Sequence, residues 1–249
     1  AGRTLDFKEP HYAEHIHGND GLGNTTFPDP VTTVQSDHAV NATIDIVMED
    51  VGKVSYVALG RLTNLALAIN MNPDLVDSIS EVIVMGGAIH QPGNSTPVAS
   101  ANLYGDVLAA SIIYDSGLKI AQVGLDVCNK VEITMNNQNQ IWDLDSQVSN
   151  FLKEITPFIR TAYGKIGTAN EGAVRYNDMP AVGYTIDNSL FRCEELKMAI
   201  ETQGQYTRGQ TINGSHRDYI GDANLVNVCL DVDDKRLIKM WMDSISSYS

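Results

Sequence analysis

Apolar and polar residues alternate along the first half of the chain in blocks typical of strands and helices that follow one another. Short apolar runs at 54–59, 81–85 and 119–125 have the length and composition of buried strands. Between them, apolar side chains recur at helical spacing over 40–48, 63–69 and 106–114. The first of these helices is expected to be capped by Ser36 and Asp37, and the other two begin at Thr63 and Asp106. This alternation predicts an α/β fold with an open, mostly parallel sheet flanked by helices.

The second half has a different texture. The pattern predicts a helix over 151–166 that is interrupted at Pro157, a short buried helix over 180–186, and a last helix behind Asp233 and Asp234. Residues 190–231 alternate more and contain several glycines, which indicates hairpins. No repeat or linker interrupts the chain, so we expect a single domain over 1–249.

The beginning of the chain predicts little regular structure. Residues 1–34 are rich in Gly, Asn, Asp and Pro, and no apolar strand precedes them. A parallel α/β domain usually starts with a buried strand, so we expect the first strands to be missing from this sequence; the alternative is a domain that starts with a loop. Missing strands would leave the strand at 54–59 with an unpaired edge, which predicts a homo-oligomer or poor solubility.

Charge narrows the classes of partner. The formal net charge is -14, and no basic patch offsets phosphate repulsion, which disfavours a nucleic-acid polymer or an anionic membrane as partner. No apolar run is long enough to span a bilayer. Cys128, Cys193 and Cys229 are few and widely spaced, so we interpret them as buried thiols in a reducing compartment and expect a cytoplasmic protein.

The stretch 81–106 is the strongest candidate for a ligand site. An apolar strand stops at Gly86-Gly87, and a polar loop then leads to a helix that Asp106 can cap. Open α/β sheets bind ligands in this position, at the carboxyl ends of their strands. The amides of Asn94 and Asn102 and the hydroxyl of Ser100 suit the hydroxyl groups of a ribose. Taken alone, the spacing favours the alternative that these residues bind their own loop backbone.

Three other stretches carry weaker signals. Asp178, just before an apolar helix, is more often a cap than a metal ligand. His15 and His17, in a glycine-rich loop, could supply an acid or a metal ligand, but such histidines are more often solvated. The polar run 216–218 has no diagnostic spacing, and the stretch 60–64 lacks the Lys and glycines of a phosphate loop.

Taken together, five motifs resemble one enzyme family in order and spacing. They are HIHGNDGLG, ALGRLTNLALAI, EVIVMGGAIHQPGNSTPVASAN, VGLDV and NDMPAVGYTID, and they are similar to those of the nucleoside hydrolases. The resemblance implies an open α/β fold that hydrolyses the N-glycosidic bond of a ribonucleoside. It also implies a bound calcium ion that orients the ribose hydroxyls and activates the attacking water.

The resemblance assigns roles to residues by position. Asp178 and the main-chain oxygen of Leu59 match calcium ligands. Asn94, Met85 and Asn102 match residues that line the ribose pocket. His17 matches a loop histidine near the base, and Asn177 stands at the catalytic position where many members carry the histidine that protonates the leaving group.

The sequence departs from the family in three places. The aspartate cluster DxDxxxDD, which supplies calcium ligands and the general base, has no counterpart. Ser100 stands where a glutamate binds the ribose 5′-hydroxyl, and the amide of Asn177 cannot donate a proton at a useful pKa. We therefore expect little or no turnover from this chain. The alternative is a non-catalytic ribose-binding or scaffold protein; phosphorolysis is disfavoured because no phosphate cradle is evident.

Overall fold

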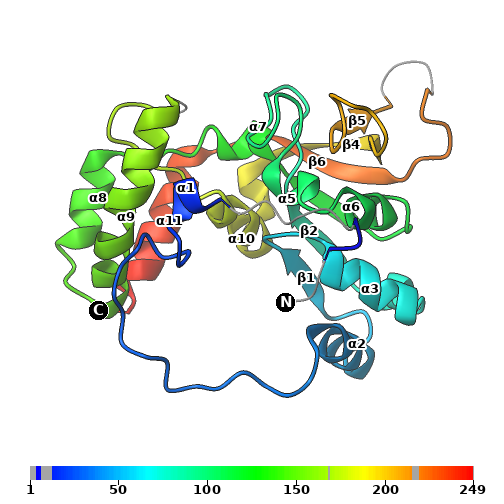
Figure 1. Cartoon of the computed structure of the whole chain (residues 1–249), viewed down its shortest axis with the longest axis horizontal. Coiled ribbons are helices and arrows are strands. Elements are labelled where there is room, and N and C mark those ends of the chain that lie inside the picture. Colours follow the sequence, from blue (N-terminus) through cyan, green and yellow to red (C-terminus); the bar gives the residue numbers. More distant parts are fainter. Residues whose placement is uncertain (1–3, 7–12, 168, 215–218, 249) are drawn as a thin grey trace. The chain divides into compact units, whose positions relative to one another are not determined.

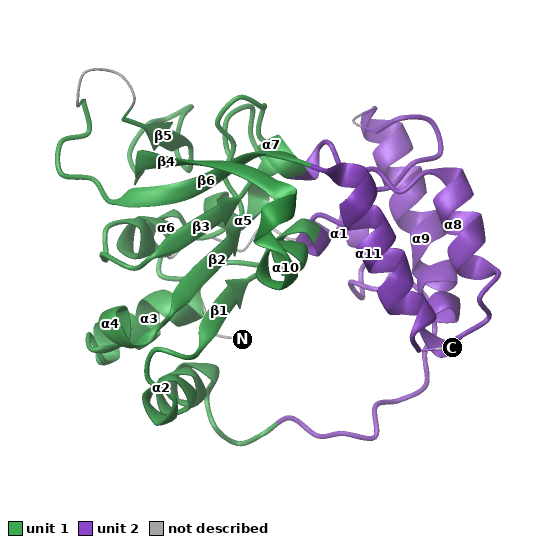
Figure 2. Cartoon of the chain, turned by 180° about the vertical axis from the view of Figure 1, so that it is seen from behind, with its two compact units in different colours: residues 1–10, 35–127, 180–232 green, residues 11–34, 128–179, 233–249 purple. Residues whose placement is uncertain are grey.

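The computed structural model describes residues 4–6, 13–167, 169–214 and 219–248 (Figure 1). Its contacts divide the chain into two compact units (Figure 2). Unit 1 comprises residues 1–10, 35–127 and 180–232, and unit 2 comprises residues 11–34, 128–179 and 233–249. This division rests on contacts, and a single domain over 1–249 stays a prediction.

Unit 1 is built on a sheet of strands in the order β1-β2-β3-β6-β4-β5. The strands are β1 (Ser55–Ala58), β2 (Glu81–Met85), β3 (Ile120–Val123), β4 (Phe191–Ile200), β5 (Thr211–Asn213) and β6 (Leu225–Val232). Neighbours from β1 to β6 run parallel, whereas β4 is antiparallel to both β6 and β5. The expected open, mostly parallel sheet is therefore confirmed, and β1 lies at one edge of the sheet that the described residues form.

Helices of unit 1 cover one face of this sheet. They are α2 (Ala39–Glu49), α3 (Thr63–Met71), α4 (Leu75–Ser78) and α6 (Val107–Tyr114). Alternate strand residues such as Val82, Val84 and Val228 share one buried cluster with them, because successive side chains of a strand point to opposite faces. The shorter α5 (Ala101–Tyr104), α7 (Leu125–Cys128) and η1 (Asn188–Leu190) follow strand ends or connect elements.

Unit 2 is helical. It contains α1 (Glu14–His17), α8 (Met135–Trp142), α9 (Gln147–Ile166) and α11 (Asp234–Ser246), and α10 (Asp178–Ile186) begins in it and continues into unit 1. The expected interruption at Pro157 is wrong, because α9 runs through it as one helix of 20 residues. Its amphipathic side and its capping box at Ser146 stabilise the helix enough to tolerate the missing backbone donor.

The helix caps show which local signals were reliable. Asp106 accepts the N–H of Ala109 at the start of α6, and Asp233 accepts that of Arg236 at the start of α11, as expected. Ser36 and Asp37 are the caps expected for α2, but His38 caps this helix instead. Its Nδ1 accepts the N–H of Val40 at 3.2 Å.

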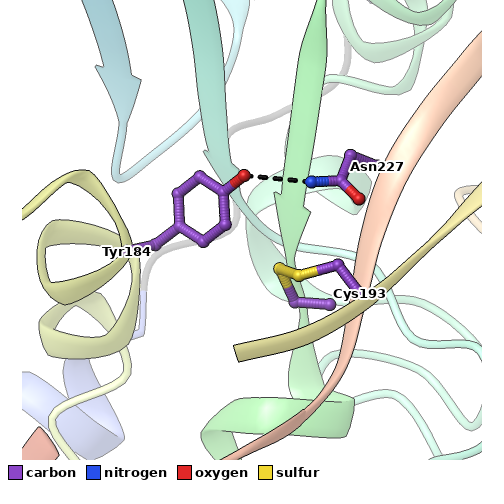
Figure 3. The surroundings of a disulfide bond; sticks show 4 residues. Tyr184, Cys193 and Asn227 are labelled. Atoms are coloured by element: carbon purple, nitrogen blue, oxygen red, sulfur yellow. Dashed lines mark hydrogen bonds between the residues drawn. A yellow bond between two sulfur atoms is a disulfide. The ribbon is translucent and has the colours of Figure 1, made fainter. Parts of the chain in front are cut away.

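A disulfide joins Cys193 on β4 to Cys229 on β6 (Figure 3). The two residues face each other in the antiparallel register, with their Cα atoms 3.9 Å apart. The interpretation of all three cysteines as thiols is therefore wrong for this pair and holds for Cys128, a buried thiol outside the disulfide. The two cysteines of the disulfide are 36 residues apart in the sequence. Their pairing could not be predicted from this spacing, because it depends on the register between β4 and β6.

No helix among the described residues is both long and apolar enough to cross a membrane.

We predict that breaking the disulfide lowers the free energy of unfolding. Cys193→Ser should cost roughly 2–4 kcal/mol, because the unfolded chain is then no longer closed across 36 residues. Urea unfolding with and without reductant measures the change. The control is the variant itself, whose stability should not respond to reductant. Equal stability of the oxidised and reduced wild type would contradict the prediction.

Candidate functional site

The side chain of Asn102 joins the carboxyl ends of two parallel strands. Its Nδ2 donates to the carbonyl of Leu59 at 3.0 Å, just beyond β1, and to that of Met85 at 2.9 Å, the last residue of β2. The same nitrogen lies 3.0 Å from Met85 Sδ. Three of the residues assigned by resemblance, Leu59, Met85 and Asn102, are thus brought together in unit 1.

Asn94 and Ser100 hold the loop that connects β2 to α5. Asn94 Oδ1 accepts the N–H of Ala101 at 2.8 Å and so caps the first turn of α5. Ser100 is 1% exposed, and its Oγ accepts the N–H of Gly87 at 2.7 Å. Both side chains thus bind the backbone of their own loop, which is the alternative that the spacing of these residues favours. Asn94 is exposed, and its Nδ2 makes no hydrogen bond within the described residues.

The loop begins with a turn that requires glycine. Gly87 has φ +86°, and a Cβ there would lie 2.7 Å from the amide of Gln122. Gln122 is fully buried on β3, and its Oε1 accepts the hydroxyl of Tyr114 at 2.7 Å. Its Nε2 has no partner among the described residues. A buried N–H group without a hydrogen-bond partner lowers the stability of the fold. The side chain of Gln122 therefore makes the surroundings of Gly87 polar as well as tightly packed.

His17 lies in unit 2, at the end of the short helix α1. Desolvation, with a smaller contribution from the neighbouring His15, lowers the pKa of His17, although the residue as a whole is exposed. The glycine-rich loop after it is held by Asp20, whose Oδ1 accepts the N–H groups of Leu22 and Asn24 at 2.8 and 2.9 Å. The role of His17 near a base stays a prediction.

Asn177 and Asp178 lie in unit 2 where α10 begins. Asn177 Nδ2 donates to the hydroxyl of Tyr163 at 3.4 Å, and its main-chain oxygen accepts the thiol of Cys128 at 3.4 Å. The buried Asn177 Oδ1 has no partner among the described residues. Burial raises the pKa of the Asp178 carboxyl to about 6. Asp178 as a whole residue is exposed, so water screens part of that effect.

The two calcium ligands assigned by resemblance, Asp178 and Leu59, do not fit a calcium ion. Calcium takes about six to eight oxygen ligands, several of them carboxylates. Among the residues that the structure describes, no group of three or more His, Cys, Asp and Glu side chains could hold a metal ion. Of the two ligands assigned by resemblance, Asp178 is one carboxylate, and the Leu59 carbonyl already accepts the amide of Asn102.

Two residues of the site were missed in the sequence. Asp126 and Thr211 are buried and bind the backbone of residues 88–90. The position of Asp126 could have been noticed in the sequence, since this residue directly follows an apolar run and therefore lies at the carboxyl end of the expected strand. Thr211 had no such signal. The polar run 216–218 lies outside the described residues.

A sequence profile described as inosine-uridine preferring nucleoside hydrolase matches residues 1–239. The chain belongs to this family. It is 33% identical over 202 residues to the inosine-uridine preferring nucleoside hydrolase of Leishmania major, covering 80% of this chain and 63% of that protein. It is 30% identical over 238 residues to the pyrimidine-specific ribonucleoside hydrolase RihA of Escherichia coli, covering 95% and 75%.

Solved structures agree with this membership. A purine-preferring ribonucleoside hydrolase from Gardnerella vaginalis superposes with a TM-score of 0.87 at 30% identity, over 94% of this chain and 73% of that one. The nucleoside hydrolase resemblance of the five motifs is therefore confirmed. The chain spans less than two thirds of the length of curated relatives such as the Leishmania protein, so its activity and substrates are matters of proposal.

We predict that Asp178 titrates near pH 6 instead of near 4. A raised carboxyl pKa favours the protonated folded state, so its contribution is complete below about pH 4 and is lost as the pH rises through about 6. Screening limits the loss to about 1 kcal/mol or less. Unfolding free energies of wild type and Asp178→Asn, compared at about pH 4 and about pH 7, measure it. A constant difference between the two proteins would refute the shift.

We also predict weak calcium binding by this nucleoside hydrolase chain. Because Asp178 is the one carboxylate that the resemblance assigns to calcium among the described residues, the dissociation constant should lie at about 1 mM or above, as for sparsely charged sites. Calorimetric titration of the wild type with calcium measures it, and Asp178→Asn serves as the matched control. Stoichiometric binding at micromolar calcium would show that the described residues assemble a site that their arrangement does not reveal.

Proposed function

We propose that this chain acts in the hydrolysis of the N-glycosidic bond of ribonucleosides to ribose and free base. In this reaction water adds to the anomeric carbon, the bond from that carbon to the base nitrogen breaks, and the base leaves with a proton. The part of the reaction that unit 1 supports is recognition of the ribose, by the loop 86–100 and Asn102.

The bridging amide of Asn102 is the observation that carries this proposal. Its Nδ2 is fixed by the carbonyls of Leu59 and Met85, which leaves the Oδ1 of the same rigid group as an acceptor for a ribose hydroxyl. The exposed Asn94 adds Nδ2 donors from the same loop. A donor and an acceptor held on fixed backbone suit vicinal hydroxyls, which both donate and accept.

The proposal names the sugar and leaves the base open. The names of the relatives include inosine-uridine preferring, pyrimidine-specific and purine-preferring enzymes, so membership of the family does not fix a base. The ribose is common to all of these substrates. From the resemblance alone, we propose that His17 and Asn177 act near a base, and that Asn177 as an amide would orient it without protonating it.

The resemblance also implies that a calcium ion would activate the attacking water. Among the described residues, no group of His, Cys, Asp and Glu side chains suffices to hold the ion, so we expect nucleoside binding with little turnover. A cytoplasmic location and a homo-oligomer stay predictions of the sequence.

We predict that Asn102→Ala weakens nucleoside binding by about tenfold or more, because it removes an acceptor and leaves the Leu59 and Met85 carbonyls without their donor. Calorimetry with inosine, uridine and ribose measures binding, and release of free base with added calcium measures turnover. Asn150→Ala, at an exposed asparagine of α9 that binds Asp145, is the control and should leave binding unchanged.

The outcomes separate the alternatives. Binding with slow release of base supports the proposal. Binding without any release favours a ribose-binding or scaffold protein of the same fold. Absence of binding by the wild type would rule out the ribose site in this chain.

A further inference from the structure

The backbone after β2 is held by side chains that come from distant parts of unit 1. Thr211, on β5, binds Ala88 twice: its Oγ1 donates to the Ala88 carbonyl at 2.8 Å and accepts the Ala88 N–H at 3.1 Å. The two residues are 123 positions apart in the sequence. Thr211 is 4% exposed and Ala88 is also buried, so water cannot replace either bond.

Asp126 holds the next two residues. Its Oδ2 accepts the N–H of Ile89 and its Oδ1 that of His90, both at 2.7 Å. The side chain is 3% exposed. A buried carboxylate is costly unless it is well hydrogen-bonded, and short bonds to charged oxygens are roughly twice as strong as neutral ones. Both carboxylate oxygens of Asp126 therefore form hydrogen bonds with the backbone.

The hairpin that carries Thr211 approaches the loop at a second point. Gly209, just before β5, has φ +82°, and a Cβ there would lie 3.2 Å from the Cβ of Ala99 and 3.1 Å from the ring of Tyr104. The hairpin therefore contacts the loop near its beginning, at Ala88, and near its end, at Ala99.

We infer that Asp126 and Thr211 are positioning residues for the ribose-holding loop. The inference rests on the proposed function. Asn102 donates to the carbonyl of Met85, three residues before Ala88, and Ser100 accepts the N–H of Gly87, the residue directly before Ala88. Displacement of residues 88–90 would move the carbonyl of Met85 and the start of the loop together. Small displacements of a binding group cost much of its effect.

Neither residue offers an atom to substrate, since the carboxylate oxygens and the hydroxyl bind backbone. Their effect must therefore pass through the loop. This distinguishes them from Asn94 and Asn102, which are proposed to touch the ribose.

The first experiment changes the hydroxyl of Thr211. Thr211→Val keeps the shape and leaves the Ala88 N–H and carbonyl unpaired, so inosine binding by the full chain should weaken about 5- to 20-fold in calorimetry. Thr211→Ser keeps the hydroxyl and should stay within about twofold of wild type. Thr43→Val is the matched control and should not change binding, because the Thr43 hydroxyl, on α2, donates to the Ala39 carbonyl within its own helix.

Amide hydrogen exchange tests the same contacts without any ligand. Thr211→Val should accelerate exchange at Ala88, and Asp126→Asn should accelerate it at Ile89 or His90, because the new amide presents a donor to one of these N–H groups. Amides of α2 and of β3 should keep their wild-type rates. Faster exchange throughout unit 1 would overturn the inference, since it would mean a general loss of stability.

The two failures are distinguishable. Local acceleration of exchange with unchanged inosine binding overturns the positioning role. A wild type that does not bind inosine overturns the proposed ribose site, and the exchange rates of the variants then still decide whether Asp126 and Thr211 hold residues 88–90.

Discussion

The site depends on two backbone carbonyls at the carboxyl ends of parallel strands, which need hydrogen-bond donors. Leu59, beyond β1, and Met85, at the end of β2, both point their carbonyls to one place, and the amide of Asn102 satisfies them together. This pair of bonds fixes α5 against two strands and thereby closes the loop that leaves β2 at Gly86. A side chain that stabilises the fold in this way also holds its remaining acceptor in one orientation, as recognition of a sugar requires.

Local chemistry was enough to predict the elements around this site. The apolar run ending at Gly86-Gly87 gave β2 its bounds, Glu81–Met85, and the aspartate caps of α6 and α11 followed from their positions before apolar helices. The alternation of strands and helices predicted the parallel part of the sheet. These inferences succeed because each depends on residues within a few positions of one another.

What could not be predicted depends on distant residues. Thr211 binds Ala88 across 123 positions, and Cys193 meets Cys229 only because β4 and β6 pair in one register. A threonine at the start of a three-residue strand carries no local sign of its partner. Pro157 gave a misleading signal because its local preference is overridden by the packing and capping of α9. The membership of the family became visible only from five motifs read in order.

The chain is acidic, but its described residues form no cation site. The reason is that its buried aspartates accept hydrogen bonds from the protein itself. Asp106 accepts the N–H groups of Leu5 and Ala109 and the hydroxyl of Thr63. Asp126 gives both oxygens to residues 89 and 90. Burial without a cation is tolerated because backbone N–H groups supply the compensating positive charge. A carboxylate used in this way builds the loop that a ligand would meet and is not itself available to a metal.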